Sequence, residues 1–156
     1  MHLTKILLKF TLIISILQSS LLFAADYQAD DILGLWLSEK KDGVIKVTSE
    51  HGKYYGHLIA FKKLPEDIGK IVLDKNNPDD SLKNRKLKGI KLFYGFTFDD
   101  DEWSGGQIYD PKSGKTYKSY MSLDGKDSLD LRGYVGIPLF GRTSTWTRIQ
   151  NIPEFK

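Results

Sequence analysis

The feature that most constrains the fold is a succession of short alternating segments after residue 25. All 14 Gly and all 5 Pro of the 156-residue chain lie in this part, where they separate segments rich in β-branched and aromatic residues. A period of two between turn residues is typical of antiparallel strands. The pattern predicts eight strands, at residues 34–39, 44–50, 53–61, 89–98, 103–109, 115–123, 128–135 and 142–149.

Most of the links between these segments have hairpin length, which predicts strands that pair in chain order. An open sheet of this size would leave two exposed edges, whereas closure into a barrel removes them. We therefore expect an all-β fold, a single antiparallel up-and-down eight-stranded barrel, with a two-sheet sandwich as the alternative. Alternation in the fourth segment places one set of side chains on a common face: Ile90, Leu92, Tyr94, Phe96 and Phe98.

The one long connection, 62–88, contains a motif typical of a helix start. Asn77 would cap the helix, Pro78 would take its first position, and Asp79 and Asp80 would face its positive end. One short helix reaching Arg85 is expected. The segment from Asp74 to Asp79 also resembles a calcium loop, but Pro78 stands where a ligand should be, so a helix-capping corner is the favoured interpretation.

The first 25 residues have the order of a signal peptide. Lys5 and Lys9 precede an apolar run from Phe10 to Phe23, and the small residues Ala24 and Ala25 follow. We expect cleavage after Ala24 or Ala25 and one β-barrel domain at 26–156; an uncleaved anchor is the alternative. Without the two lysines the formal charge falls from +3 to +1, and no transmembrane segment would remain after cleavage.

The remaining composition excludes several kinds of chemistry. The chain has no Cys, which rules out disulfides and thiolate sites. After cleavage its only histidines would be His51 and His57, and no HExxH, GxSxG or Walker motif occurs. We therefore expect no catalytic residue, metal or cofactor. A net charge of +1 also argues against nucleic-acid binding, so we interpret the basic stretch 83–88 and the acidic run 99–102 as solvated loops.

Two tryptophans mark the expected seam of the barrel. The first strand contains Gly34 and Trp36, and the last contains Trp146 and Arg148. Because the first and last strands of a closed barrel are neighbours, Arg148 is expected to lie across the face of Trp36 as a closure contact. This Gly-x-Trp with a late Arg resembles the corresponding pair of lipocalin-like barrels.

A longer ordered set of motifs resembles one bacterial family. The motifs are Asp74 with Asn77-Pro78-Asp79, Trp103-Ser104-Gly105-Gly106-Gln107-Ile108-Tyr109-Asp110-Pro111, Arg132-Gly133-Tyr134-Val135-Gly136, Gly141-Arg142-Thr143 and Trp146-Thr147-Arg148. Over about residues 32–149 the chain is similar to secreted proteins grouped as domain of unknown function 2147. The resemblance implies an exported, β-rich, lipocalin-like domain and no particular reaction. Members commonly have a Cys where this chain has Lys88.

Two functions fit these observations. The first is a non-enzymatic binding module for a small apolar or amphipathic ligand, inside the barrel or at its mouth. Its candidate contacts are Trp103, Tyr109, Tyr117, Arg132, Tyr134 and Arg142, although the aromatics could simply fill the barrel. The second is a structural or protein-interaction role in the bacterial envelope, with a filled barrel and the long connection as contact surface. The expected location is outside the cytoplasm, in the periplasm or fully secreted.

Overall fold

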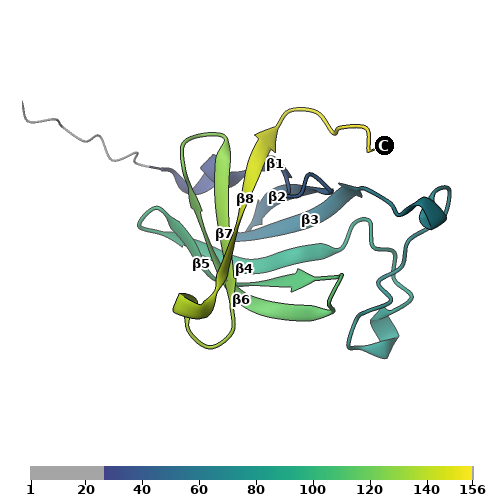
Figure 1. Cartoon of the computed structure of the whole chain (residues 1–156). Coiled ribbons are helices and arrows are strands. Elements are labelled where there is room, and N and C mark those ends of the chain that lie inside the picture. The colour runs from purple at the N-terminus through teal and green to yellow at the C-terminus, as the bar shows by residue number, and fades with distance from the viewer. Residues whose placement is uncertain (1–26, 156) are drawn as a thin grey trace, which may run out of the picture.

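A computed structural model describes residues 27–155, and the predicted signal segment lies outside the described residues. The eight expected strands are all present. They are β1 (Gly34–Leu37), β2 (Gly43–Glu50), β3 (Lys53–Phe61), β4 (Lys91–Asp99), β5 (Glu102–Asp110), β6 (Lys115–Leu123), β7 (Ser128–Tyr134) and β8 (Arg142–Ile149). Each strand pairs with the next in antiparallel orientation, and β1 pairs with β8, so the sheet is a closed barrel (Figure 1). This confirms the barrel over the sandwich.

The barrel has one plugged end. The 3-10 turn η1 (Ala29–Ile32) lies there and accepts hydrogen bonds from two buried indoles. Trp36 Nε1 donates to Ile32 O at 2.8 Å, and Trp103 Nε1 donates to Ala29 O at 3.0 Å. The β4–β5 turn also lies at this end, since Asp101 accepts a bond from the Tyr27 backbone N–H. We call this the closed end.

The middle of the barrel is filled by aromatic side chains that pack against glycines. Phe93 and Phe96 are fully buried and meet edge to face, with ring centroids 5.4 Å apart. A Cβ on Gly56 would come within 2.2 Å of the Phe93 ring, and one on Gly106 within 2.3 Å of the Phe96 ring. The two glycines therefore make the space that these rings occupy.

The expected face of the fourth segment was wrong in one respect. Leu92 and Phe93 are both buried, whereas Tyr94 is exposed. The cause is a pair of register irregularities between β3 and β4, with Gly95 in the left-handed region at φ +83°. Each extra residue on β4 shifts the phase of the alternation, so a period of two holds only between the bulges.

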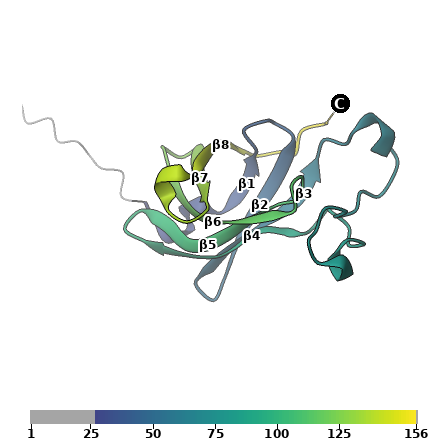
Figure 2. The same ribbon diagram turned by 60° about the horizontal axis from the view of Figure 1, so that its bottom comes forward.

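The long connection from Lys62 to Ile90 projects from the side of the barrel opposite to the β4–β5 turn (Figure 2). It contains two three-residue 3-10 turns, η2 (Pro65–Asp67) and η3 (Asp80–Leu82), in place of the expected helix. The N-cap of η3 is Asp79, whose carboxylate accepts from Ser81 N, so the expected cap at Asn77 and first position at Pro78 were wrong. A further 3-10 turn, η4 (Pro138–Phe140), lies between β7 and β8. No helix within residues 27–155 is long and apolar enough to cross a membrane.

Asn77 does not cap a helix because its side chain forms other hydrogen bonds. Asn77 is buried, and its amide nitrogen donates to Asp74 while its oxygen accepts from the Asp79 backbone. An isolated bridge between Leu73 and Lys86 closes the loop formed by residues 74–85. Both constraints hold residues 74–79 in a compact loop instead of the start of a regular helix.

Candidate functional site

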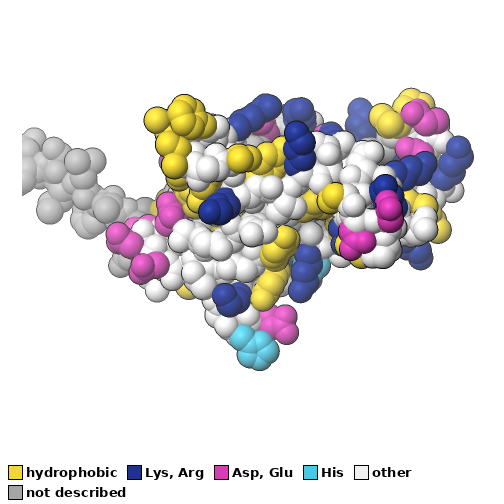
Figure 3. Space-filling view, turned by 90° about the horizontal axis from the view of Figure 1, so that it is seen from below, with side chains coloured by type: hydrophobic (Ala, Val, Ile, Leu, Met, Phe, Trp, Pro, Cys, Tyr) yellow, Lys and Arg dark blue, Asp and Glu magenta, His cyan; other side chains and the backbone are white. Residues whose placement is uncertain are grey.

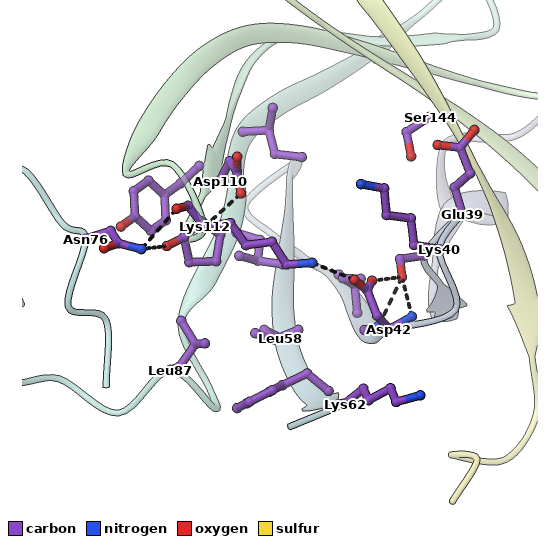
Figure 4. A pocket seen from close by; sticks show the side chains of 18 of the residues that line it. Glu39, Lys40, Asp42, Leu58, Lys62, Asn76, Leu87, Asp110, Lys112 and Ser144 are labelled. Carbon is purple, nitrogen blue, oxygen red and sulfur yellow. Dashed lines mark hydrogen bonds and ion pairs between the residues drawn. The ribbon is translucent and has the colours of Figure 1, made fainter. Parts of the chain in front are cut away.

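A cavity of about 770 Å³ opens at the end of the barrel opposite to η1 (Figure 4). It is bounded by the β1–β2 turn, the ends of β3 and β7, the long connection, the β5–β6 turn and the start of β8. We call it the open-end cavity. Its volume lies within the range of about 300–1,000 Å³ that is usual for small-molecule sites.

The wall of this cavity is apolar. Buried wall residues come from six different strands: Ile45, Leu58, Leu92, Tyr109, Leu131 and Trp146. Phe61, Ile108 and Tyr117 add half-buried surface nearer the opening. Because the filled middle of the barrel lies below this wall, the cavity is a pocket with a floor and does not run through the molecule.

The rim of the cavity carries more basic than acidic residues. Its cations are Lys40, Lys62, Lys63, Lys75, Lys112 and Arg142, and its acids are Glu39, Asp42, Asp67 and Asp110. Among the described residues, the only ion pair between members of this set joins Lys112 Nζ to Asp42 Oδ2 at 2.6 Å. Figure 4 shows Lys112 reaching toward Asp42 and the Lys40 side chain extending into the space near Ser144.

The Lys112–Asp42 pair connects the β5–β6 turn to the β1–β2 turn across the opening. Burial by itself would raise the pKa of Asp42, but hydrogen bonds from Lys112 and Ser38 and the Lys112 charge hold that pKa below its ordinary value. Asp42 is therefore a carboxylate with two partners at neutral pH. The other turn acid, Asp110, accepts from Lys112 N and from the Ser113 hydroxyl.

Apart from the Lys112–Asp42 pair, five cations and three acids remain on the rim, so its charge is net positive. No ion pair within residues 27–155 involves Lys40, Lys62, Lys75 or Arg142. All four are exposed, so their charges face solvent at the opening. An apolar pocket with unpaired cations at its mouth matches a molecule that has an apolar body and an anionic head.

A buried polar cluster, Asp74, Asn77, Arg85 and Tyr109, anchors the long connection to the barrel wall. Asp74 is 1% exposed, and it accepts from the Tyr109 hydroxyl at 2.6 Å, from Asn77 Nδ2 at 2.9 Å and from Arg85 Nε at 2.9 Å. Arg85 also lies 5.6 Å from the Tyr109 ring centroid. Burial, followed by the bond to Asp74, raises the pKa of Tyr109 to about 12. The cluster is fully partnered and serves as an anchor.

Three of the four expected closure residues, Gly34, Trp36 and Arg148, lie together at the closed end. Trp36 is paired directly with Arg148 across β1 and β8, and the guanidinium carbon lies 4.2 Å from the indole centroid. A Cβ on Gly34 would come within 3.2 Å of Arg148 Nη1, so this glycine leaves room for the guanidinium. Trp146 has a different place, because it lines the open-end cavity and packs against Phe93.

The six candidate ligand contacts do not form one site. Tyr109, Tyr117 and Arg142 line the open-end cavity. Trp103 does not, because it is fully buried at the closed end beneath η1. Arg132 and Tyr134 do not line it either, since the inward positions of β7 are taken by Leu129, Leu131 and Gly133.

Sequence reasoning missed the aliphatic wall and the lysine rim. The wall residues stand at inward positions of their strands, and the alternation of side chains along each strand could have identified them. They include Ile45, Leu58, Leu92 and Leu131. The basic rim comes from three separate turns and connections, and only closure of the barrel brings Lys40, Lys62 and Lys112 together.

The two described histidines lie outside this site. His57 is half-buried on β3, and burial, together with Lys91 and Lys46, lowers its pKa. His51 lies in the exposed β2–β3 turn. Within residues 27–155, no three His, Asp or Glu side chains are grouped so that they could hold a metal ion. The acidic run 99–102 forms the β4–β5 turn, as expected.

Comparison with known proteins agrees with this architecture. A family model described as "Uncharacterized protein conserved in bacteria (DUF2147)" matches residues 34–148. Among solved structures, the chain is similar to protein HP1028 from the human pathogen Helicobacter pylori, which is described as belonging to the lipocalin family. That similarity has 25% identity and a TM-score of 0.67, and it covers 76% of this chain and 83% of the other. No curated protein matches the chain.

Proposed function

The chain belongs to the bacterial family DUF2147, and we propose that it is an exported, non-enzymatic protein that binds a small amphipathic ligand in its open-end cavity. The observation that carries the proposal is the combination of an apolar pocket of about 770 Å³ with unpaired cations at its rim. The lipocalin description of HP1028 supports a ligand-holding barrel. The amino-terminal pattern supports export, with the periplasm as the destination.

The ligand's body would contact the aliphatic wall, and its head would meet the rim. The rim cations available to this head are those used in no ion pair of the described chain: Lys40, Lys62, Lys75 and Arg142. Arg142 can present two parallel donors to a carboxylate or phosphate. The rim acids Asp42 and Asp110 already accept hydrogen bonds from Ser38, Lys112 and Ser113.

Isothermal titration with dodecanoate and with dodecanol tests the proposal, because the two probes share the alkyl chain and differ in the head group. We expect both to bind and dodecanoate to bind more tightly. Arg142→Glu should remove most of the difference between the two probes. Equal affinities in the unmodified protein would refute the role of the rim.

Gly133→Leu tests the location of the site. Gly133 lines the cavity, and a Cβ there would meet Ile108 and Tyr117 only at ordinary contact distances of 3.6 Å. A leucine side chain should therefore occupy the pocket without disrupting the backbone and should abolish dodecanoate binding. Thr147→Leu is the matched control, since Thr147 is exposed on β8. Unchanged binding by the Gly133 variant would place the ligand outside the open-end cavity.

A further inference from the structure

The connection between β7 and β8, residues 135–141, carries an exposed cluster of large apolar side chains. The exposed fractions are 72% for Val135, 54% for Ile137, 75% for Leu139 and 79% for Phe140. We call this segment the apolar loop. In Figure 3 hydrophobic side chains gather at the upper left, where this loop projects from the barrel (Figures 1 and 3). Contiguous exposed apolar surface of this kind is typical of interaction sites.

The loop is held in place by the side chain of Arg132. Its Nε donates to Pro138 O at 2.9 Å, its Nη2 to Leu139 O at 3.3 Å, and its Nη1 to Thr143 Oγ1 at 2.9 Å. Gly141 N also donates to Pro138 O, which closes the turn. The backbone carbonyls are thus satisfied from inside, while the apolar side chains point outward into solvent.

The charged residues next to the loop in the sequence and on the adjoining strand positions are basic. No acid occurs between Asp130 and Glu154 in the sequence, a stretch that contains three arginines. On the neighbouring strands, exposed Lys118 pairs with Tyr134, and exposed Arg142 pairs with Gly133. Tyr120 and Tyr134 add aromatic rings at the base, with centroids 6.4 Å apart.

We propose that the apolar loop inserts into the surface of a bilayer containing anionic phospholipid. An apolar tip, aromatic rings at its base and flanking cations are the three elements that bind a segment at a lipid–water interface. Charge complementarity selects anionic lipid over a neutral surface. The inference does not depend on the ligand of the open-end cavity.

A second exposed apolar group shows why the charge matters. Leu64 and Ile68 are 60% and 72% exposed in the long connection. Glu66 and Asp67 stand between them in the sequence, and an anionic surface would repel both acids. Lys62, Lys63 and Lys70 flank this group, so it differs from the apolar loop in the two acids that separate its apolar residues and in its smaller apolar surface. It serves as the comparison segment.

The test is flotation of the processed protein, purified after export, with two kinds of vesicle. One contains phosphatidylcholine alone, and the other contains about one third phosphatidylglycerol. We expect binding to the anionic vesicles that weakens with salt. The double variant Leu139→Ser/Phe140→Ser should reduce binding by about tenfold or more, since two large side chains no longer transfer from water. Lys118→Glu should also weaken it, whereas Ile68→Ser should not.

A second measurement locates the insertion. Phe140→Trp should keep vesicle binding, and its added fluorescence should shift to the blue when anionic vesicles are present. The same probe at Ile68→Trp should show no shift. Equal flotation of the double variant and the unmodified protein would overturn the proposal. Loss of a concentration-dependent dimer in the double variant, without vesicle binding by either protein, would overturn it in favour of self-association.

Discussion

Arg148 of the last strand lies across the ring of Trp36 in the first strand, with its guanidinium carbon 4.2 Å from the indole centroid. The same guanidinium donates to Leu33 O at 2.7 Å, to Asp31 O at 2.5 Å and to Lys126 O at 2.6 Å. One side chain therefore joins the barrel seam, the plug at the closed end and the β6–β7 turn.

Replacing this arginine tests its part in closure. Arg148→Ala should lower the free energy of unfolding by about 1–3 kcal/mol, because three carbonyls lose a charged donor. Arg148→Lys should recover only part of the loss, since a lysine keeps the charge but not the three-way geometry. Thermal and urea unfolding measure both. Arg142→Ala is the control, and a loss of stability equal to that of Arg148→Ala would contradict the assignment.

The anchor of the long connection is expected to be sensitive to the loss of its acid. Asp74→Ala leaves Arg85 and Tyr109 without their buried acceptor, which should cost about 3 kcal/mol or more. Tyr109→Phe removes a single hydrogen bond and should cost about 1 kcal/mol. Hydrogen exchange should show faster opening of residues 62–90 in the Asp74 variant. Protection unchanged in that segment would argue against an anchoring role.

Two buried tyrosines predict a loss of stability at alkaline pH. Burial and the bond to Asp30 raise the pKa of Tyr54 to about 12, and burial and the bond to Asp74 raise that of Tyr109 to about 12. Both values exceed the ordinary tyrosine value of 10.0, so the folded state retains these protons longer than the unfolded state does. The contribution is complete below pH 10 and declines as the pH rises toward 12.

Phenolate absorbance during an alkaline titration measures this directly. The double variant Tyr54→Phe/Tyr109→Phe should lack the late-titrating component and show a flatter dependence of stability on pH in that range. Titration of all tyrosines near the ordinary value in the folded protein would contradict the prediction.

The filled middle of the barrel makes Gly106 intolerant of a side chain. A Cβ there would lie 2.3 Å from the Phe96 ring, so Gly106→Ala should destabilise the protein by about 1–3 kcal/mol through overpacking. Adding Phe96→Leu should restore part of the loss, because the smaller side chain vacates that space. A double-mutant cycle on unfolding free energies measures the coupling, and simple additivity would contradict the contact.

Much of the fold could be predicted from alternation and turn residues. All eight strands appear near their expected positions, and the Trp36–Arg148 contact follows from the order of the strands in a closed barrel. The phase of β4 could not be predicted, because bulges beside Leu92 and Gly95 depend on the register of β3. The length of the turn at Asp80 also depended on a distant partner, since Asn77 is held by Asp74 and Tyr109.

The residues of the candidate site could also be predicted only in part. Tyr109, Tyr117 and Arg142 were selected from the sequence as contacts, and they do line the open-end cavity. Arg132 was selected with them because its guanidinium can bind an anion. Its side chain, however, lies on the other side of the sheet and donates to the apolar loop. Residue type suggests what a side chain can bind, whereas the side of the sheet on which it stands decides what it can reach.

The sequence by itself determined the strand order and closure of the barrel, because these depend on local periodicity and on the turn residues between strands. Tertiary structure alone decided which end of the barrel is plugged, where the cavity opens and which charges surround it. Those properties depend on side chains from separate turns, such as Lys112 and Asp42, meeting at 2.6 Å across the opening. Contacts of this kind depend on the register and twist of several strands together, and the sequence of one segment does not specify them.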